Sequence, residues 1–311
     1  MGFVALIFAL VLEQGRPLPR ANPVHRLIVD LADLLRGLTD AGEARHGVLG
    51  WFVLVGGLIG LLAGLESLLA GLHPIAVFGF HVLVLYFTLG FRQFSHAFTS
   101  VQLALVAGDI TEARRLVQQW LQPDNPDLFA DDLSVPSICR LAISNALVAS
   151  HRHVFGPLFW YLLLPGAIGP VLYRLAQMLA ARWAADELYG QFAQKAYRWI
   201  DWLPTRLSAA GFAVVGSFED AVYAWRTALA AGTGGDQRAL LLAAGGGALG
   251  IRLADPALQA QWQQTAGQDL EAPDSEPGID GLRSAVGLVW RSVVLWVSLY
   301  AMLTVAAWVG R

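Results

Sequence analysis

Four aspartates lie close together in the stretch PDNPDLFADDLSVP, namely Asp124, Asp127, Asp131 and Asp132. Carboxylate oxygens beside a phosphate are the ligands that Mg²⁺ takes in many nucleotide-using enzymes. Aspartate also favours turns and helix caps, and no phosphate-loop motif accompanies this group. We interpret these residues first as turn residues and keep a magnesium site as the alternative.

Histidines and the single cysteine are the next candidates for chemistry. His151 and His153 are two positions apart, a spacing that places their side chains on different faces of a helix, and neither they nor His96 have a carboxylate or thiolate beside them. We therefore expect interfacial or core positions for the histidines. Cys139 stands alone, which excludes an intramolecular disulfide and a thiolate metal cage.

Two charged residues fall within apolar stretches. Glu66 interrupts one such stretch, and Arg174 lies in another. A charge at membrane depth is costly and normally faces a protein partner or a water-filled cavity, whereas one near a helix end reaches the interface. Both interpretations stay open for each residue. The run Gly245–Gly250 lacks the ending of a phosphate loop and indicates close helix packing by small residues.

The composition indicates a membrane protein. Hydrophobic residues make up 56% of the 311 residues, charged residues only 14%, and the mean hydropathy is +0.51. Soluble proteins carry about 25% charged residues. The net charge of -3 provides no basic surface for phosphates, so we exclude a nucleic-acid partner.

Four stretches approach the length of a spanning helix, about 20 apolar residues. They are Gly47–Leu72, Ile75–Phe91, Val154–Trp183 and Ala285–Val309. His73 and Pro74 separate the first two, which predicts a helical hairpin, and three prolines predict a broken third passage.

Several further segments are less clearly assigned. Gly2–Leu12 favours a retained first helix over a signal peptide. Leu203–Phe218 is a short span, a re-entrant helix or a half-buried one. Pro23–Leu38 predicts an amphipathic helix, and Arg92–Leu121 is either one long helix or two that meet at Gly108-Asp109.

The fold predicted is therefore all-α, a polytopic transmembrane bundle of about four to six spans with cytoplasmic amphipathic helices. Arginines gather in segments 13–46 and 92–153, which the positive-inside rule places in the cytoplasm. We expect residues 1–311 to form a single integral membrane domain in the bacterial inner membrane, with a periplasmic N-terminus and a polar loop at 259–280.

Several strings occur in an order that resembles the CobD/CbiB and AmpE superfamily of inner-membrane proteins. They are NPVHRL at Asn22–Leu27, FRQFSHAF with GDITEARR within Phe91–Arg115, GPLFWYLLLPGAIGPVLYR at Gly156–Arg174, WLPTRLSAAGF at Trp202–Phe212 and GGALGIRL at Gly246–Leu253. In the CobD/CbiB branch the resemblance implies adenosylcobinamide-phosphate synthase, which joins an aminopropanol-type amine to the cobyric acid carboxylate and depends on ATP and Mg²⁺.

The chain departs from that branch at acidic positions. Ser144, Val148 and Arg152 stand where the enzymes carry acids, and Ala176–Leu179 and Tyr197-Arg198 replace two further motifs that contain aspartate. RLAISNALV at Arg140–Val148 and IDWLPTRL at Ile200–Leu207 are instead similar to AmpE-like chains. That branch comprises accessory or signalling proteins linked to β-lactamase induction.

From this pattern we expect an AmpE-like regulatory or ligand-binding protein without turnover, with no cofactor or metal site. Its partners would be the lipid bilayer and an unidentified small ligand or membrane protein. The candidate ligand-binding residues kept from the superfamily are Arg92, His96, Glu112, Arg114, Asn145 and Arg206. Interfacial anchoring is an equal interpretation for Arg92 and Arg206.

Two other functions stay open. One is the cobalamin-pathway synthase, an amide-forming ligase that would use ATP and Mg²⁺ and carry its carboxylates at other positions such as Asp124–Asp132. The other is a transporter or channel, which predicts inverted repeats and polar residues along the spans.

Overall fold

The computed structural model describes residues 2–15, 22–121, 133–230, 232, 235–253 and 276–310. The regular structure of these residues is helical, without strands, so the all-α prediction is confirmed. Most of the aspartate-rich stretch and of the predicted polar loop at 259–280 lies outside the described residues. The chain divides into two compact units, and each is described by itself.

The first unit comprises Met1–Gln93 and His153–Pro204. Its helices are α1 (Gly2–Gly15), α2 (Pro23–Thr39), α3 (Ala44–Leu72), α4 (Pro74–Thr88), α8 (Gly156–Leu163), α9 (Ile168–Arg182) and the part of α10 (Gly190–Val215) up to Pro204. Asn22 and His73 cap α2 and α4, and a proline with a preset backbone angle follows each cap.

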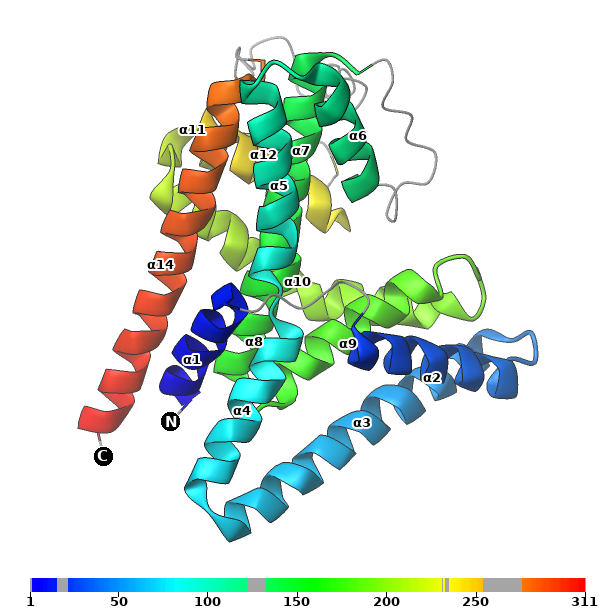
Figure 1. Ribbon diagram of the computed structural model, residues 1–311. Coiled ribbons are helices and arrows are strands. Elements are labelled where there is room, and N and C mark those ends of the chain that lie inside the picture. Colours follow the sequence, from blue (N-terminus) through cyan, green and yellow to red (C-terminus); the bar gives the residue numbers. More distant parts are fainter. Residues whose placement is uncertain are drawn as a thin grey trace. The chain divides into compact units, whose positions relative to one another are not determined.

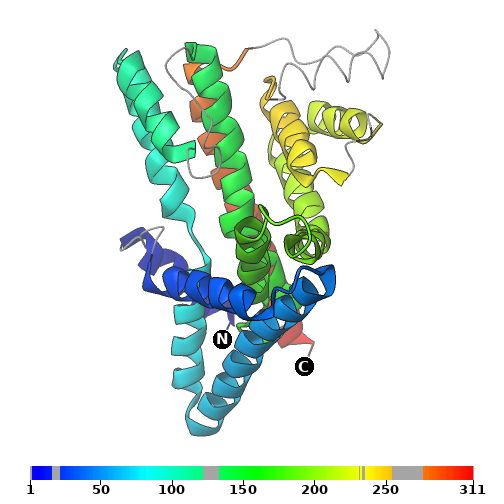
Figure 2. The ribbon, with the colours of Figure 1, turned by 90° about the vertical axis from the view of Figure 1, so that its right-hand side faces the viewer.

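Helices α3 and α4 form the predicted hairpin, with a turn at His73 (Figures 1 and 2). Helix α3 also packs against α2 and α9. The buried side chains of this contact include Trp51, Leu54, Leu175, Leu179 and Trp183. This apolar core fixes α2, α3 and α9 together and so provides the frame for the polar residues described below.

The third predicted passage is broken, as its prolines indicated. Helix α8 ends at Leu163, Gly166 adopts a left-handed φ of 70°, and α9 begins at Ile168. A Cβ at Gly169 would lie 2.0 Å from the carbonyl oxygen of Trp160, so α8 and α9 approach each other more closely than any larger residue would allow.

The second unit comprises Phe94–Arg152 and Thr205–Arg311. Its helices are α5 (Phe91–Val106) from Phe94 on, α6 (Ile110–Leu121), α7 (Val135–Ser150), the rest of α10, α11 (Phe218–Ala230), α12 (Gln237–Leu249) and α14 (Ile279–Val309). The break between α5 and α6 confirms the two-helix alternative. Gly247 would place a Cβ 2.4 Å from the carbonyl oxygen of Asp220, which confirms that this glycine run packs helices.

Leu203–Phe218 is not an element of its own. Helix α10 runs without interruption from Gly190 through Pro204 to Val215. The prediction set its start at the proline, where a helix usually breaks, but the apolar and polar periodicity upstream of Pro204 continues the same helix.

Two of the described helices are long and apolar enough to cross a membrane, α3 and α14. They expose large apolar side chains to their surroundings; Met302 and Trp308 of α14 are 70% and 79% exposed. Contiguous apolar surface of this kind is unfavourable in water and favourable in lipid, so a membrane-embedded helical protein is the consistent interpretation. Helices α1 and α4 are apolar but shorter, and the number of spans stays a prediction.

Two glycines of α3 provide a matched test of this packing. We expect Gly47→Ala to destabilise the protein by about 1–3 kcal/mol through overpacking, because its Cβ would lie 2.0 Å from the carbonyl oxygen of Tyr189. Gly56→Ala adds a methyl group to open space and should be neutral or slightly stabilising. Thermal unfolding in detergent measures both, and equal melting temperatures would contradict the described contact.

Candidate functional site

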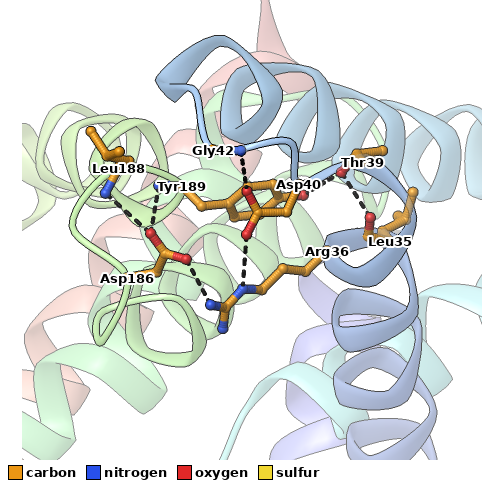
Figure 3. Close-up of polar contacts among 8 residues, drawn as sticks. All are labelled: Leu35, Arg36, Thr39, Asp40, Gly42, Asp186, Leu188 and Tyr189. Atoms are coloured by element: carbon orange, nitrogen blue, oxygen red, sulfur yellow. Dashed lines mark hydrogen bonds and ion pairs between the residues drawn. The ribbon is translucent and has the colours of Figure 1, made fainter.

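Tyr189 fixes the C-terminal end of α2 (Figure 3). Its side chain is buried, and its hydroxyl lies 2.8 Å from the Oγ1 of Thr39. Gly47 and Gly50 of α3 leave the space for it, since a Cβ at Gly50 would lie 2.1 Å from the tyrosine hydroxyl. The glycines of the sequence GVLGW therefore allow α2, α3 and the start of α10 to meet around one aromatic ring.

Ion pairs tie α2 to the end of α9 and to the segment that follows it. Arg36 donates to Asp186 at 2.6 Å, and Asp186 accepts hydrogen bonds from the backbone N–H groups of Leu188 and Tyr189 (Figure 3). One turn earlier on α2, Asp33 receives a two-pronged contact from Arg182, with N–O distances of 2.8 and 2.6 Å. These contacts set the position of α2 along α9, and with it the position of the NPVHRL motif.

A buried carboxylate lies where α9 meets α10. Asp201 is 4% exposed and accepts a 2.8 Å hydrogen bond from the hydroxyl of the fully buried Tyr173. That hydroxyl also lies 3.4 Å from the hydroxyl of Tyr197. Gly156 leaves room for the tyrosine ring, because a Cβ there would lie 2.2 Å from the Cζ of Tyr173. The GPLFW, PVLYR and IDWLP strings thus meet at this carboxylate.

The next residue of α9, Arg174, is held by neutral groups. Its Nη1 donates to the Oε1 of Gln177 at 2.7 Å and lies 3.0 Å from the Nδ1 of His153. Burial, and then the nearby Arg174 guanidinium, lower the pKa of His25 below its ordinary value of 6.5. The His25 ring of α2 therefore lies within electrostatic range of Arg174 and is uncharged at neutral pH.

We call this group the polar cluster. It consists of His25, His153, Tyr173, Arg174, Gln177, Tyr197 and Asp201. The cluster offers a carboxylate that can accept a proton or hold an ammonium group, two imidazoles and a guanidinium whose planar fork matches oxyanions. Such a set is suited to a reaction between an amine and an anionic partner.

A second polar group lies in the α3–α4 hairpin region. Glu66 Oε1 is 2.9 Å from His81 Nε2, and the Nδ1 of His81 is 3.1 Å from the hydroxyl of Tyr161. Glu66 also accepts a hydrogen bond from the backbone N–H of Ala167. Of the two interpretations kept for Glu66, the structure supports the one with protein partners.

The residues predicted as ligand-binding do not all lie in one unit. Arg92 is in the first unit, where its side chain donates to the backbone oxygen of Gln14 and its N–H donates to Glu13 at 2.9 Å. It therefore joins α1 to α5. The second unit holds His96, Glu112, Arg114, Asn145 and Arg206.

Glu112 and Arg114 contact neighbouring parts of the second unit. Glu112 pairs with Arg115 at 2.7 Å on an exposed turn of α6, and Arg114 donates to the backbone oxygen of Leu133 at 2.9 Å. The side chain of His96 is exposed. As ligand-binding residues these six stay a prediction.

The remaining sequence candidates have structural partners. His151 is 3% exposed and lies 2.9 Å from the Oγ of Ser208 and 3.2 Å from the Oγ1 of Thr205. His153 contacts Arg174 instead, so the two histidines point to different partners, as their spacing predicted. Burial raises the pKa of Cys139 to about 11, which leaves its thiol protonated and unreactive.

The described residues do not assemble a metal site. Across the described ranges, no group of three or more His, Cys, Asp or Glu side chains is placed to hold an ion. Mg²⁺ needs several oxygen ligands, even when phosphate supplies some of them, and Asp201 alone provides one carboxylate. The described residues therefore do not fit a resident metal.

The fold and the polar cluster define a helical membrane protein whose recurring motifs meet at buried polar groups. The family described as "CobD/Cbib protein" matches residues 3–289, so the chain belongs to the CobD/CbiB family. It is 33% identical over 304 residues to the cobalamin biosynthesis protein CobD of Stutzerimonas stutzeri, covering 95% of each chain. It is 34% identical over 223 residues to the protein of the same name from Chromobacterium violaceum, covering 70% of this chain and 68% of that one. No solved structure gives a significant match.

These relatives overturn the predicted function. The expectation of an AmpE-like regulatory protein without turnover, linked to β-lactamase induction, is wrong, because the named relatives are cobalamin biosynthesis proteins over most of the chain. The prediction gave too much weight to the missing acids. Ser144 and Val148 are buried on α7, where an uncharged side chain suits the apolar packing.

Sequence reasoning also missed the main carboxylate. Asp201 stands inside the IDWLPTRL string, but that string was compared only for its resemblance to a family. The signal available was a lone acidic residue in an apolar stretch of α10, of the same kind that singled out Glu66.

The Asp186 contact predicts an acid dependence of stability. The hydrogen bond from the Tyr189 N–H, followed by Arg36, lowers the pKa of Asp186 below its ordinary 3.8. A lowered carboxyl pKa contributes stability above the unfolded value, and this contribution is lost as the pH falls through the folded value. Between pH 5 and pH 3, in about the range of unperturbed carboxyl groups, the melting temperature should therefore fall less for Asp186→Asn than for the wild type.

Arg36→Gln is the companion variant. It should remove only part of this acid dependence, because the Tyr189 N–H still stabilises the carboxylate. A pH profile of Asp186→Asn that parallels the wild type would contradict the assignment.

Proposed function

We propose that the chain acts in cobalamin biosynthesis as the amide-forming synthase of its family, adenosylcobinamide-phosphate synthase. The observation that carries the proposal is the convergence of three family strings, GPLFW, PVLYR and IDWLPTRL, on the buried carboxylate of Asp201 in one unit. The extended similarity to relatives named cobalamin biosynthesis protein CobD supports the same function.

The chemistry of amide formation requires groups that the cluster holds. The amine nitrogen forms a bond to the activated acyl carbon, and the C–O bond to the activating phosphate breaks. The phosphate leaves with the electron pair of that bond, and the amine gives up a proton. A carboxylate within hydrogen-bonding reach serves as the proton acceptor or holds the ammonium form of the substrate. We assign this role to Asp201, with the Tyr173 hydroxyl as its positioning donor. ATP is a substrate of this reaction and would bring Mg²⁺ bound to its phosphates.

The proposed cellular location follows from the arginine distribution. A multi-pass arrangement in the inner membrane with a periplasmic N-terminus places segments 13–46 and 92–153 in the cytoplasm. Helix α2 and His25 belong to the first of these segments, so the cluster would open to the side of the membrane that holds ATP. The bilayer is the proposed partner. Arg92, His96, Glu112, Arg114, Asn145 and Arg206 are further candidates for substrate contacts.

Genetic rescue tests the proposed function. A bacterial strain blocked between cobyric acid and cobinamide should regain cobalamin-dependent growth when it expresses the wild-type chain. Asp201→Asn should abolish rescue, since the amide keeps the size of the side chain but accepts no proton. Glu219→Gln, which changes an exposed carboxylate in the first turn of α11, is the matched control and should rescue.

Each variant must be present in the membrane fraction at comparable amounts. Absence of rescue by wild-type protein that is present at the level of a rescuing family member would contradict the proposal. Full rescue by Asp201→Asn would contradict only the role given to Asp201.

A further inference from the structure

Arg174 has no described ion pair, in contrast to four other arginines of the chain. Among described residues, Arg36, Arg45, Arg115 and Arg182 each pair with a carboxylate. Arg174 contacts Gln177 and His153, both neutral acceptors, and none of the described ion pairs includes it. Arg174 is partly exposed, and a guanidinium that is partly withdrawn from water is stabilised by an opposite charge. The protein itself supplies no such charge among the described residues.

The surroundings of Arg174 add potential donors rather than carboxylates. His25 approaches from the first turn of α2, and its lowered pKa reflects burial and the repulsion of the guanidinium. The His153 ring and the Gln177 amide contact the Nη1 of the guanidinium. The nearest carboxylate of the cluster, Asp201, has its described hydrogen bond with Tyr173. The arrangement thus combines one uncompensated cation with neutral groups that can donate to an oxyanion.

We propose that Arg174, His153 and Gln177 form a binding site for an oxyanion, the phosphate of a nucleotide or the carboxylate of an organic acid. The guanidinium fork binds two oxygens of either group. The bound anion supplies the charge that Arg174 lacks. The amide N–H groups of Gln177 and the second ring nitrogen of His153 donate to the remaining oxygens. Only the identification of the anion as a substrate group rests on the proposed function. Binding of an oxyanion at this site can be measured whether or not the protein catalyses a reaction.

Isothermal titration of the purified full-length protein in a non-ionic detergent tests the site directly. Inorganic phosphate, ATP without metal and acetate are the three probes. At least one should bind saturably, and the strongest of them identifies phosphate or carboxylate as the source of the oxyanion. Arg174→Gln should weaken that binding by about 30-fold or more, as truncation of one partner of a buried charge pair does.

Two further variants control this result. Arg45→Gln removes an exposed arginine at the start of α3 that is already paired with Glu43, and it should bind the probe like the wild type. Arg174→Lys keeps the charge but loses the fork, so binding should weaken and remain measurable. If Arg174→Gln does not fold, Arg174→Lys and the rise of the wild-type melting temperature with added probe decide the question.

The proposal is overturned if no probe binds the folded wild-type protein, or if Arg174→Lys and Arg174→Gln bind as tightly as the wild type. Binding that depends on Arg174 in a chain that fails to rescue growth would retain the oxyanion site and reject the synthase. Rescue of growth by a chain that binds none of the probes would retain the synthase and reject the oxyanion site.

Discussion

Polar side chains among apolar helices must find their partners within the protein, and this constraint shapes the first unit. Water is scarce where Tyr173 and Asp201 lie, because both side chains are almost completely buried. The hydroxyl and the carboxylate therefore satisfy each other at 2.8 Å. Glu66 follows the same rule with His81 and the backbone of Ala167. Among the described residues of the first unit, Glu66 and Asp201 are thus charges for which the fold provides a partner.

Small residues make this arrangement sterically possible. Gly156 admits the ring of Tyr173, and Gly47 and Gly50 admit Tyr189. Each glycine belongs to a helix that would tolerate alanine for its own stability. Glycine is required because a tyrosine ring occupies the neighbouring space. Tyr173 places its hydroxyl at Asp201, and Tyr189 places its hydroxyl at Thr39. Helix packing and the position of the polar groups thus depend on the same contacts.

Much of the helical framework follows from the sequence. Asn22-Pro23 and His73-Pro74 mark helix starts, and the prolines around Gly166 mark the break between α8 and α9. These signals are local and act within a few residues. Pro204 misled the same reasoning, because the surrounding helix α10 overrides its tendency to end a helix.

The polar cluster was less accessible to prediction. Its members come from α2, the π-helical turn at His151–Phe155, α9 and α10, and their proximity depends on tertiary contacts such as Arg182 with Asp33. Motif similarity singled out strings that meet at Asp201, but it did not indicate which residue of each would lie there. It also favoured Ser144 and Val148 as evidence against catalysis, although the burial of both on α7 indicates only that this helix is part of the core of the second unit.

The central claim is that the first unit carries an amide-forming site built around Asp201. Its most direct test is product detection by mass spectrometry after purified protein in detergent is incubated with adenosylated cobyric acid, an aminopropanol-type amine, ATP and Mg²⁺. We expect a product with the mass of the amide to accumulate with the wild-type protein and to be absent with the folded Asp201→Asn variant. No amide from folded wild-type protein, under conditions in which a family member forms it, would contradict the account.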